Sequence, residues 1–463
     1  MPVPRSAKIS MSASPYKQLE QEFKRLHAFR GALALLRWDA AVMMPRGSAD
    51  VRGEQLAALE TEHHALLTAP RIIRLLDRAQ GKFEAFVPYL EEVVHLVRDK
   101  AALLGQALNL APYDALVDEF SPGLTTADID AMFKALSRRL PALIREAIIA
   151  QEGRPFLPLN GKFPAGKQRA LIVEVMKAVG FQFDRGRLDE SEHPFTEGVP
   201  GDLRVTTRFD PDDVFTGLLG ALHETGHAMY DLGLPQEWRD QPVGRDRGMA
   251  LEESQSLLIE MMVCRSRPFV RYVQPLIARH FGTSGPEWEV ENVYGHLTRV
   301  QRGLIRVDAD ELTYPLHIML RYELEKQLLS GELAVRDLRE AWNAGMEQRL
   351  GIRPSNDLEG CLQDIHWAVG SFGYFPSYAL GAVIAAQLYE SLRAELPGLD
   401  EQLARGEFSG LFGWLRTHVH GLGAKVPVQE LLKEATGKPL SAASFVRYVE
   451  AKYLETTASS AAA

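Results

Sequence analysis

Apolar residues recur every three or four positions along most of the chain, the spacing that places them on one face of an α-helix. Proline and glycine, as in Pro200-Gly201 and Gly351, fall between the periodic segments and separate one predicted helix from the next. The pattern predicts helices at residues 16–40, 49–68, 83–108, 126–152, 166–179, 212–231, 249–281, 286–305, 310–330, 335–350, 378–395, 408–420, 428–436 and 442–456. The fold is therefore predicted to be mainly α.

One segment, residues 203–209, has β-branched residues and a rough alternation of apolar and polar positions, which indicates a strand. It precedes the helix predicted at 212–231, so we expect a small β element beside that helix. The chain has no internal repeat and no long low-complexity linker. We therefore expect one domain over residues 1–463, with flexible ends at 1–14 and 456–463.

Composition narrows the function classes. The net charge of -9 comes from 61 acidic and 52 basic residues that are mixed along the chain, so no basic surface for nucleic acid is expected. No uncharged apolar stretch reaches the roughly 18 residues that span a bilayer, and the first residues do not form a secretion signal. The two cysteines, Cys264 and Cys361, are too few for a disulfide framework. These features predict a cytoplasmic protein with neither nucleic acid nor membrane as a partner.

The sequence His223-Glu224-Thr225-Gly226-His227 lies within a predicted helix. Four residues make about one helical turn, so His223 and His227 share a face and can bind one ion at about 2.1 Å. Glu224 is placed to take a proton from a metal-activated water and to return it to a leaving amine. The motif predicts a catalytic zinc site, on a helix for which Asp210 is the expected N-cap and Pro211 the first residue.

A catalytic zinc needs a third protein ligand. No histidine follows His227 at the spacing that would supply one from the same segment, so the ligand is expected from the next helix. There Glu253, Glu252 and Glu260 compete, in that order. Asp231, one turn beyond His227, is a candidate acceptor for an imidazole N–H, although a surface role is equally compatible with the pattern.

Further motifs occur in a fixed order along the chain: Leu36-Arg37-Trp38-Asp39, His193-Pro194-Phe195, Asp202-Leu203-Arg204-Val205-Thr206, Glu253-Ser254-Gln255, Ile305-Arg306-Val307-Asp308-Ala309-Asp310, Gly360 to Trp367 with Gln363-Asp364 and His366-Trp367, and Gly373-Tyr374-Phe375-Pro376-Ser377-Tyr378. Together with the histidine motif, this set resembles the carboxypeptidase Taq family of metallocarboxypeptidases over nearly the whole chain.

The resemblance implies a mostly helical fold with a deep central groove, a catalytic Zn2+ that Co2+ can often replace, and commonly a homodimer. It implies removal of C-terminal residues from peptides with broad specificity, and it assigns Glu253 as the third ligand. One position departs from the family, which usually has histidine where this chain has Glu252. Glu252 could support a metal ligand, alter the metal preference or disfavour acidic substrates, and the sequence leaves these alternatives open.

Binding of a terminal carboxylate calls for a fixed cation, and an oxyanion calls for hydrogen-bond donors. The candidates for the carboxylate are Arg204, Arg306 and Arg353; those for the oxyanion are His366, Tyr374 and Tyr378; His193 and Gln363 are expected to shape the groove. The main chain of residues 203–209 is a further candidate, because an extended peptide could pair with it.

Two other functions compete with a carboxypeptidase. The histidine motif is equally compatible with an oligopeptidase or endopeptidase of the same type, since it does not distinguish terminal from internal cleavage. A non-catalytic metal-binding scaffold is the third alternative. The presence of Glu224 argues against the scaffold, because a structural site needs ligands but no proton acceptor.

Overall fold

The computed structural model describes residues 83–153, 156–191, 194–199, 202–238 and 241–454. The helices predicted at 16–40 and 49–68, the motif at 36–39 and both expected flexible ends lie outside the described residues.

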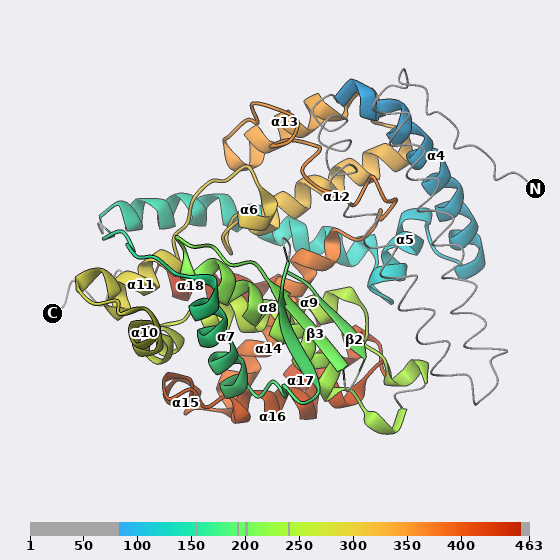
Figure 1. Cartoon of the computed structure of the whole chain (residues 1–463). Helices are drawn as coiled ribbons and strands as arrows, with labels where there is room; N and C mark the ends of the chain where they lie inside the picture. Colours follow the sequence, from blue (N-terminus) through green and yellow to red (C-terminus); the bar gives the residue numbers. More distant parts are fainter. Residues whose placement is uncertain (1–82, 154–155, 192–193, 200–201, 239–240, 455–463) are drawn as a thin grey trace, which may run out of the picture.

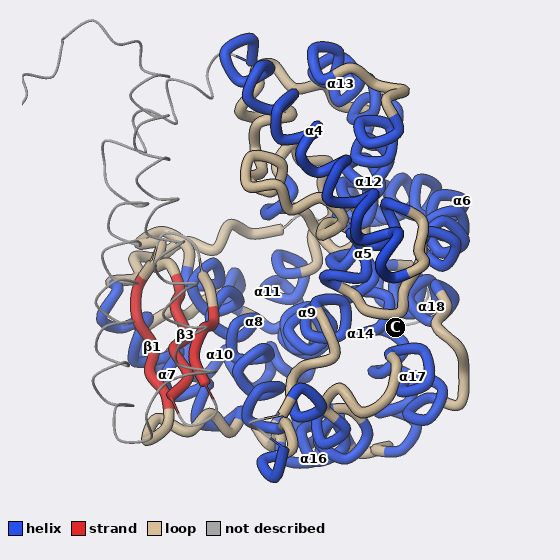
Figure 2. Tube along the Cα trace, turned by 90° about the vertical axis from the view of Figure 1, so that its right-hand side faces the viewer, coloured by secondary structure: helices blue, strands red, loops and turns tan. Residues whose placement is uncertain are grey.

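Helices make up most of the described chain, so the predicted mainly α fold is confirmed (Figure 1). Both views place α4 and α13 at one end of the molecule and α16 at the other, with α8, α9 and α14 between them (Figures 1 and 2). The α-helices are α4 (Phe83–Leu108), α5 (Pro112–Phe120), α6 (Thr126–Glu152), α7 (Ala165–Val179), α8 (Val214–Gly233), α9 (Met249–Leu257), α10 (Arg267–Phe281), α11 (Val290–Leu297), α12 (Tyr314–Ser330), α13 (Leu338–Leu350), α14 (Pro376–Glu395), α15 (Leu399–Ala404), α16 (Ser409–His418), α17 (Val428–Thr436) and α18 (Ala442–Tyr453). Among the described residues, no helix is both long and apolar enough to cross a membrane.

A three-stranded sheet lies against α8 (Figure 2). Its strands are β1 (Gly186–Glu190), β2 (Thr196–Val199) and β3 (Asp202–Thr207), in the order β1-β3-β2. β3 runs parallel to β1, with Leu188 opposite Val205, and antiparallel to β2, with Thr196 opposite Val205. The predicted strand is thus confirmed at β3. Because β3 is hydrogen-bonded on both sides, the expected pairing of its main chain with a peptide is wrong.

The long helix predicted at 249–281 is interrupted. α9 ends at Leu257, a π-helical segment covers Leu258–Cys264, and α10 begins only at Arg267, where Ser266 caps it by accepting from the backbone N–H of Phe269. A π-helical turn has one more residue than an α-helical one, and such turns are frequent at functional sites.

The start of α8 also differs from the prediction. Asp213, not Asp210, is the N-cap, and its side chain accepts from the backbone N–H of Phe215. Asp210 instead pairs with Asp213 in an isolated bridge, so Pro211 precedes the helix. Both aspartates suit an N-cap by residue type, and the turn that joins β3 to α8 decides between them.

α9 lies between α8 and α14, and two glycines permit the close approach. A β-carbon at Gly226 of α8 would lie 2.6 Å from Cα of Ser256, and one at Gly381 of α14 would lie 2.9 Å from Cβ of Glu253. These separations are closer than any side chain allows. Absence of a side chain at both positions therefore brings the backbone that carries Glu253 against the helix that carries the two histidines.

Candidate metal centre

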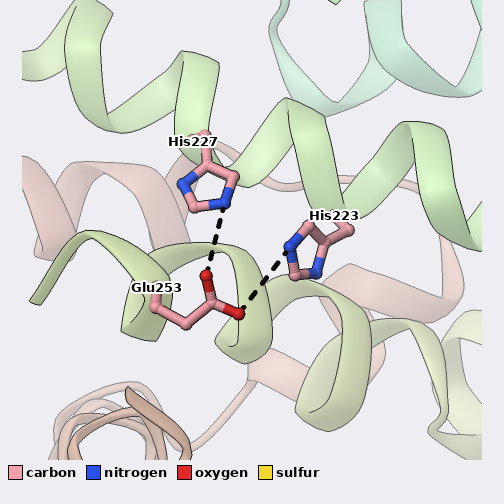
Figure 3. Close-up of side chains that lie close together, drawn as sticks. All are labelled: His223, His227 and Glu253. Atoms are coloured by element: carbon pink, nitrogen blue, oxygen red, sulfur yellow. Dashed lines mark ion pairs between the residues drawn. The ribbon is translucent and has the colours of Figure 1, made fainter. Parts of the chain in front are cut away.

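His223 and His227 stand one turn apart on α8, and Glu253 faces them from α9 (Figure 3). Oε1 of Glu253 lies 3.9 Å from Nε2 of His223, and its Oε2 lies 3.8 Å from Nε2 of His227. One ligand atom from each of the three residues lies within 4.8 Å of the others. Ligand atoms bound at about 2.1 Å to a tetrahedral ion are about 3.4 Å apart, so small side-chain adjustments would let the three enclose one ion.

The outer nitrogen of each imidazole faces another carboxylate. Nδ1 of His223 lies 2.9 Å from Oε2 of Glu260, whose other oxygen accepts from Arg265 at 2.7 Å. Nδ1 of His227 lies 3.5 Å from Oε1 of Glu252. The three glutamates that compete for the third-ligand position in the sequence thus occupy different places, and of these only Glu253 faces both inner nitrogens.

The pKa values follow from this crowding of buried groups. Burial alone would lower the pKa of His223, but the hydrogen bond with Glu260 and the charges of Glu253 and Glu224 outweigh it and raise the pKa to about 10. Burial, with the charge of His223 adding to it, lowers the pKa of His227 to about 3. Burial raises the pKa of Glu253 to about 7. A largely buried carboxylate between two imidazoles is a donor set that suits a divalent cation, so these residues fit a bound metal.

Glu224 is held beside this triad by a residue that the sequence did not single out. The hydroxyl of Thr196, on β2, lies 2.8 Å from Oε2 of Glu224 and 2.8 Å from its backbone oxygen. Burial raises the pKa of Glu224, although the hydrogen bond from Thr196 and the charge of His223 act against it. Thr196 lies three residues after His193 in the chain, and only the sheet brings it to α8.

His366, Tyr374 and Tyr378 lie together at the start of α14 and in the loop before it. Nε2 of His366 lies 3.2 Å from the hydroxyl of Tyr378, and the rings of Tyr374 and Tyr378 are 5.2 Å apart. The Tyr374 hydroxyl lies 3.5 Å from the sulfur of Met249, the first residue of α9. Burial, reinforced by the charge of Glu253, raises the pKa of Tyr378 to about 12, so it stays a hydrogen-bond donor at neutral pH.

Arg306 borders this aromatic group, with its guanidinium carbon 4.6 Å from the ring centre of Tyr378. It is buried, and its Nε and Nη2 contact Oδ1 of Asp364 at 3.0 and 2.9 Å. Gln363 accepts from the backbone N–H of Arg306 at 2.9 Å and from the side chain of Arg321 at 2.8 Å. These contacts hold Gln363 and most of the Arg306 side chain within the protein.

Arg353, Arg204, His193 and Asp231 are the predicted site residues that remain. Arg353 is exposed and pairs with Glu340 at 2.7 Å and Glu347 at 3.4 Å. Arg204 is exposed on β3, between the buried Leu203 and Val205, and His193 lies outside the described residues. Asp231 has no recorded contact with His227 within the described chain, whereas Glu252 does.

Comparison with known proteins shows the family to which the chain belongs. The family described as Carboxypeptidase Taq (M32) metallopeptidase matches residues 18–82 and 77–453. Carboxypeptidase 1 of Bacillus subtilis (strain 168) is 33% identical over 94% of this chain and 98% of its own length. Thermostable carboxypeptidase 1 of Thermus thermophilus is 34% identical over 93% of this chain and 97% of its own.

Solved structures give the same result. Metallocarboxypeptidase 1 of Trypanosoma cruzi superimposes with a TM-score of 0.79 at 36% identity, over 95% of this chain and 99% of that one. The M32 carboxypeptidase of Deinococcus radiodurans R1 gives a TM-score of 0.77 at 33% identity, over 96% and 99%. By its sequence, its fold and the matched family, the chain belongs to the carboxypeptidase Taq (M32) family of metallopeptidases.

Proposed function

We propose that this metallocarboxypeptidase uses zinc held by His223, His227 and Glu253, with Glu224 as the general base. The observation that carries the proposal is the convergence of two imidazole nitrogens and one carboxylate, from α8 and α9, within 4.8 Å. When bound, zinc supplies activation of a water molecule for attack on a peptide carbonyl. Cobalt is expected to substitute for zinc. That the protein is a homodimer and that it is cytoplasmic stay predictions.

Glu224 has the placement that a proton shuttle needs. It is buried beside the triad, and Thr196 holds the carboxylate through its Oε2, which leaves Oε1 without a recorded donor in the described chain. Its raised pKa brings it closer to neutral pH, where a base can both accept and return a proton. Glu224 would take the proton of the attacking water and deliver it to the leaving amine.

His366, Tyr374 and Tyr378 are the proposed donors to the oxyanion. Tyr378 is neutral at physiological pH, and burial lowers the pKa of His366 to about 4, so all of these groups act as neutral donors. Arg306 lies against Tyr378 and is proposed to attract the terminal carboxylate electrostatically while its guanidinium stays paired with Asp364. Gln363 supports this arginine by accepting from its backbone N–H. Broad specificity follows if the enzyme recognises the terminal carboxylate of the peptide and not the side chain of its last residue. Arg353 is paired with Glu340 and Glu347 at the surface, and substrate-binding roles for Arg204 and His193 stay predictions from the sequence.

Peptide products test the activity. Incubation of a peptide with a free C-terminus, and of the same peptide with an amidated C-terminus, is followed by mass spectrometry, with zinc content measured on the same sample. A carboxypeptidase shortens the free peptide one residue at a time and leaves the amidated one intact. Equal internal cleavage of both would establish an endopeptidase instead.

The variant Glu224→Gln tests the general base. It keeps the size of the side chain and the three metal ligands but removes the proton acceptor. We expect zinc content equal to that of the wild type and a loss of hydrolysis of about 100-fold or more. Unchanged hydrolysis would refute the assignment, and loss of zinc would show that Glu224 supports the metal site instead.

A further inference from the structure

The imidazole of His227 lies between two consecutive glutamates of α9. Its Nε2 faces Oε2 of Glu253 at 3.8 Å, and its Nδ1 faces Oε1 of Glu252 at 3.5 Å. Nδ1 is buried and has no hydrogen-bond partner among the residues that the structure describes. The carboxylate of Glu252, for its part, receives no recorded hydrogen bond from any described residue and is 24% exposed. A buried donor without an acceptor and a largely buried acceptor without a donor therefore face each other.

The other histidine, His223, makes the corresponding contact at hydrogen-bonding distance. His223 has the same orientation, with Nε2 toward Glu253 and Nδ1 toward a carboxylate, but there the distance to Glu260 is 2.9 Å. Closing the His227–Glu252 distance of 3.5 Å to the 2.9 Å of the His223–Glu260 contact takes about 0.6 Å of side-chain movement. The two imidazoles thus have the same arrangement: a glutamate at Nδ1 of each ring leaves Nε2 to face the ion.

We propose that Glu252 is a positioning residue for the metal: it accepts the Nδ1–H of His227 and fixes this ring with Nε2 toward the ion. The inference rests on the proposed metal-binding role of His223, His227 and Glu253. A carboxylate behind a ligating imidazole raises its basicity and selects its tautomer, and loss of such a partner typically weakens metal binding about 10- to 100-fold. Of the alternatives that the sequence left open for Glu252, the contact with His227 selects support of a metal ligand.

A competing explanation is that Glu252 acts only through its charge. Asp231 and Asp246 are near enough to contribute, after burial, to the raised pKa of Glu252, so the surroundings are acidic as a whole. Asp246 already accepts from the backbone N–H of Gly248, whereas Asp231 has no recorded contact with the His227 ring. Asp231→Asn therefore removes a nearby negative charge without removing the proposed hydrogen bond, and it is the matched control.

The experiment measures the zinc dissociation constant of the full-length protein by competition with a chromophoric chelator. The variants are Glu252→Gln, which keeps a neutral acceptor oxygen, Glu252→Met, which keeps length but has no oxygen, and Asp231→Asn. We expect the dissociation constant to rise about 10- to 100-fold in Glu252→Met, by less in Glu252→Gln, and to change little in Asp231→Asn. The visible absorption spectrum of the Co2+-loaded protein should shift in Glu252→Met and stay unchanged in Asp231→Asn.

Three results would overturn the proposal: an unchanged dissociation constant in Glu252→Met, equal losses in Glu252→Met and Asp231→Asn, or an unshifted Co2+ spectrum. Urea unfolding of the metal-free proteins checks that each variant folds. If Glu252→Met does not fold, the zinc dissociation constant of Glu252→Gln is compared with that of Asp231→Asn instead. A wild-type protein that binds no metal would remove the proposed function and this inference together. Metal binding by the wild type that is insensitive to Glu252 would remove this inference alone.

Discussion

At the scale of single residues, Asp364 is the carboxylate that holds two buried arginines. Oδ1 contacts Arg306 at 2.9 Å and Oδ2 contacts Arg321 at 2.5 Å. The Arg321 side chain is completely buried and also lies over the ring of Trp342, 4.5 Å from its centre. Burial acts to raise the pKa of Asp364, but the two arginines outweigh it and lower the pKa to about 2. The carboxylate is therefore charged at neutral pH.

We predict that Asp364→Asn destabilises the protein by about 3–5 kcal/mol, because it leaves two buried guanidiniums without a charged partner. Urea unfolding of the metal-free variant measures the change. Glu340→Gln is the control, since Glu340 pairs with Arg353 on the surface, where loss of an ion pair has little effect. Equal stability of the Asp364 variant and the wild type would show that these arginines are not held by charge.

Arg306 shows why the role of a site residue is harder to predict from the sequence than its presence. The sequence indicates a guanidinium for the terminal carboxylate, but it does not reveal that Asp364, fifty-eight positions later, occupies two of its nitrogens. In the same way, spacing brings Glu252, Glu253 and Glu260 near the histidines. Which imidazole nitrogen each one faces depends on how closely α9 approaches α8, and this distance is set by tertiary packing.

At the scale of elements, the approach of α9 to α8 depends on Gly226. We predict that Gly226→Ala lowers the free energy of unfolding by about 1–3 kcal/mol and weakens metal binding, because the new Cβ would meet backbone atoms of Ser256 and Gln255 that cannot rotate away. Gly413→Ala is the matched control: this glycine also lies inside a helix, α16, but nothing lies within 4 Å of the added carbon. There, alanine should stabilise the protein by about 0.5–1 kcal/mol. Urea unfolding and zinc titration measure both effects, and a metal affinity unaffected by Gly226→Ala would contradict the packing argument.

A buried glutamate on α12 holds the loop that carries His366 and Tyr374. Glu325 accepts from Trp367 Nε1 at 2.9 Å, from the Gly373 backbone N–H at 2.9 Å and from the Tyr113 hydroxyl at 2.7 Å. These donors lower its pKa, yet burial outweighs them and raises the pKa from 4.5 to about 7. The folded protein therefore binds the proton of Glu325 more tightly than the unfolded chain does.

This pKa shift predicts a pH-dependent contribution to stability. The stabilisation from neutral Glu325 is fully present below about pH 4.5 and is lost as the pH rises to about 7. We expect the free energy of unfolding of the wild type, relative to that of Glu325→Gln, to fall by up to about 1.4 kcal/mol per pH unit within this window. Urea unfolding of both proteins at several pH values measures it. A difference independent of pH would mean that Glu325 keeps an ordinary pKa in the fold.

Helical periodicity predicted helices such as α6 and α17 closely, because each of them buries one face and exposes the other. The predicted ranges 83–108, 126–152 and 428–436 coincide with α4, α6 and α17. The missed elements were short ones, whose periodicity is too brief to detect: α5, α15, β1 and β2. The π-helical segment after α9 was also missed, since an apolar run such as Leu258–Cys264 fits an α-helix equally well in sequence.

At the scale of the whole molecule, α8 and α9, the helices that carry the metal centre, lie with α14 in the middle of the described structure (Figure 1). The ligands of this centre come from α8 and α9, and Gly381 places α14 directly against Glu253. Without an ion, the carboxylate of Glu253 and the inner nitrogens of the two imidazoles face one another with no metal to bind, although His223 keeps its contact with Glu260. An ion that binds only the folded protein stabilises it by mass action, by about 4 kcal/mol when its free concentration is 1,000 times its dissociation constant.

We therefore predict that removal of metal by a chelator lowers the unfolding temperature, and that added zinc restores it. The loss of stability should extend beyond α8 and α9 to α14, because α14 packs at Gly381 directly against Glu253 of α9. Hydrogen exchange of the backbone amides in α14 can measure this. Glu253→Gln supplies the control: with one ligand weakened, its unfolding temperature should respond little to either chelator or zinc. An unfolding temperature of the wild type that does not depend on metal would mean that the three ligands are held in place by the packing of α8, α9 and α14 alone, and the ion would then serve the chemistry without contributing to the fold.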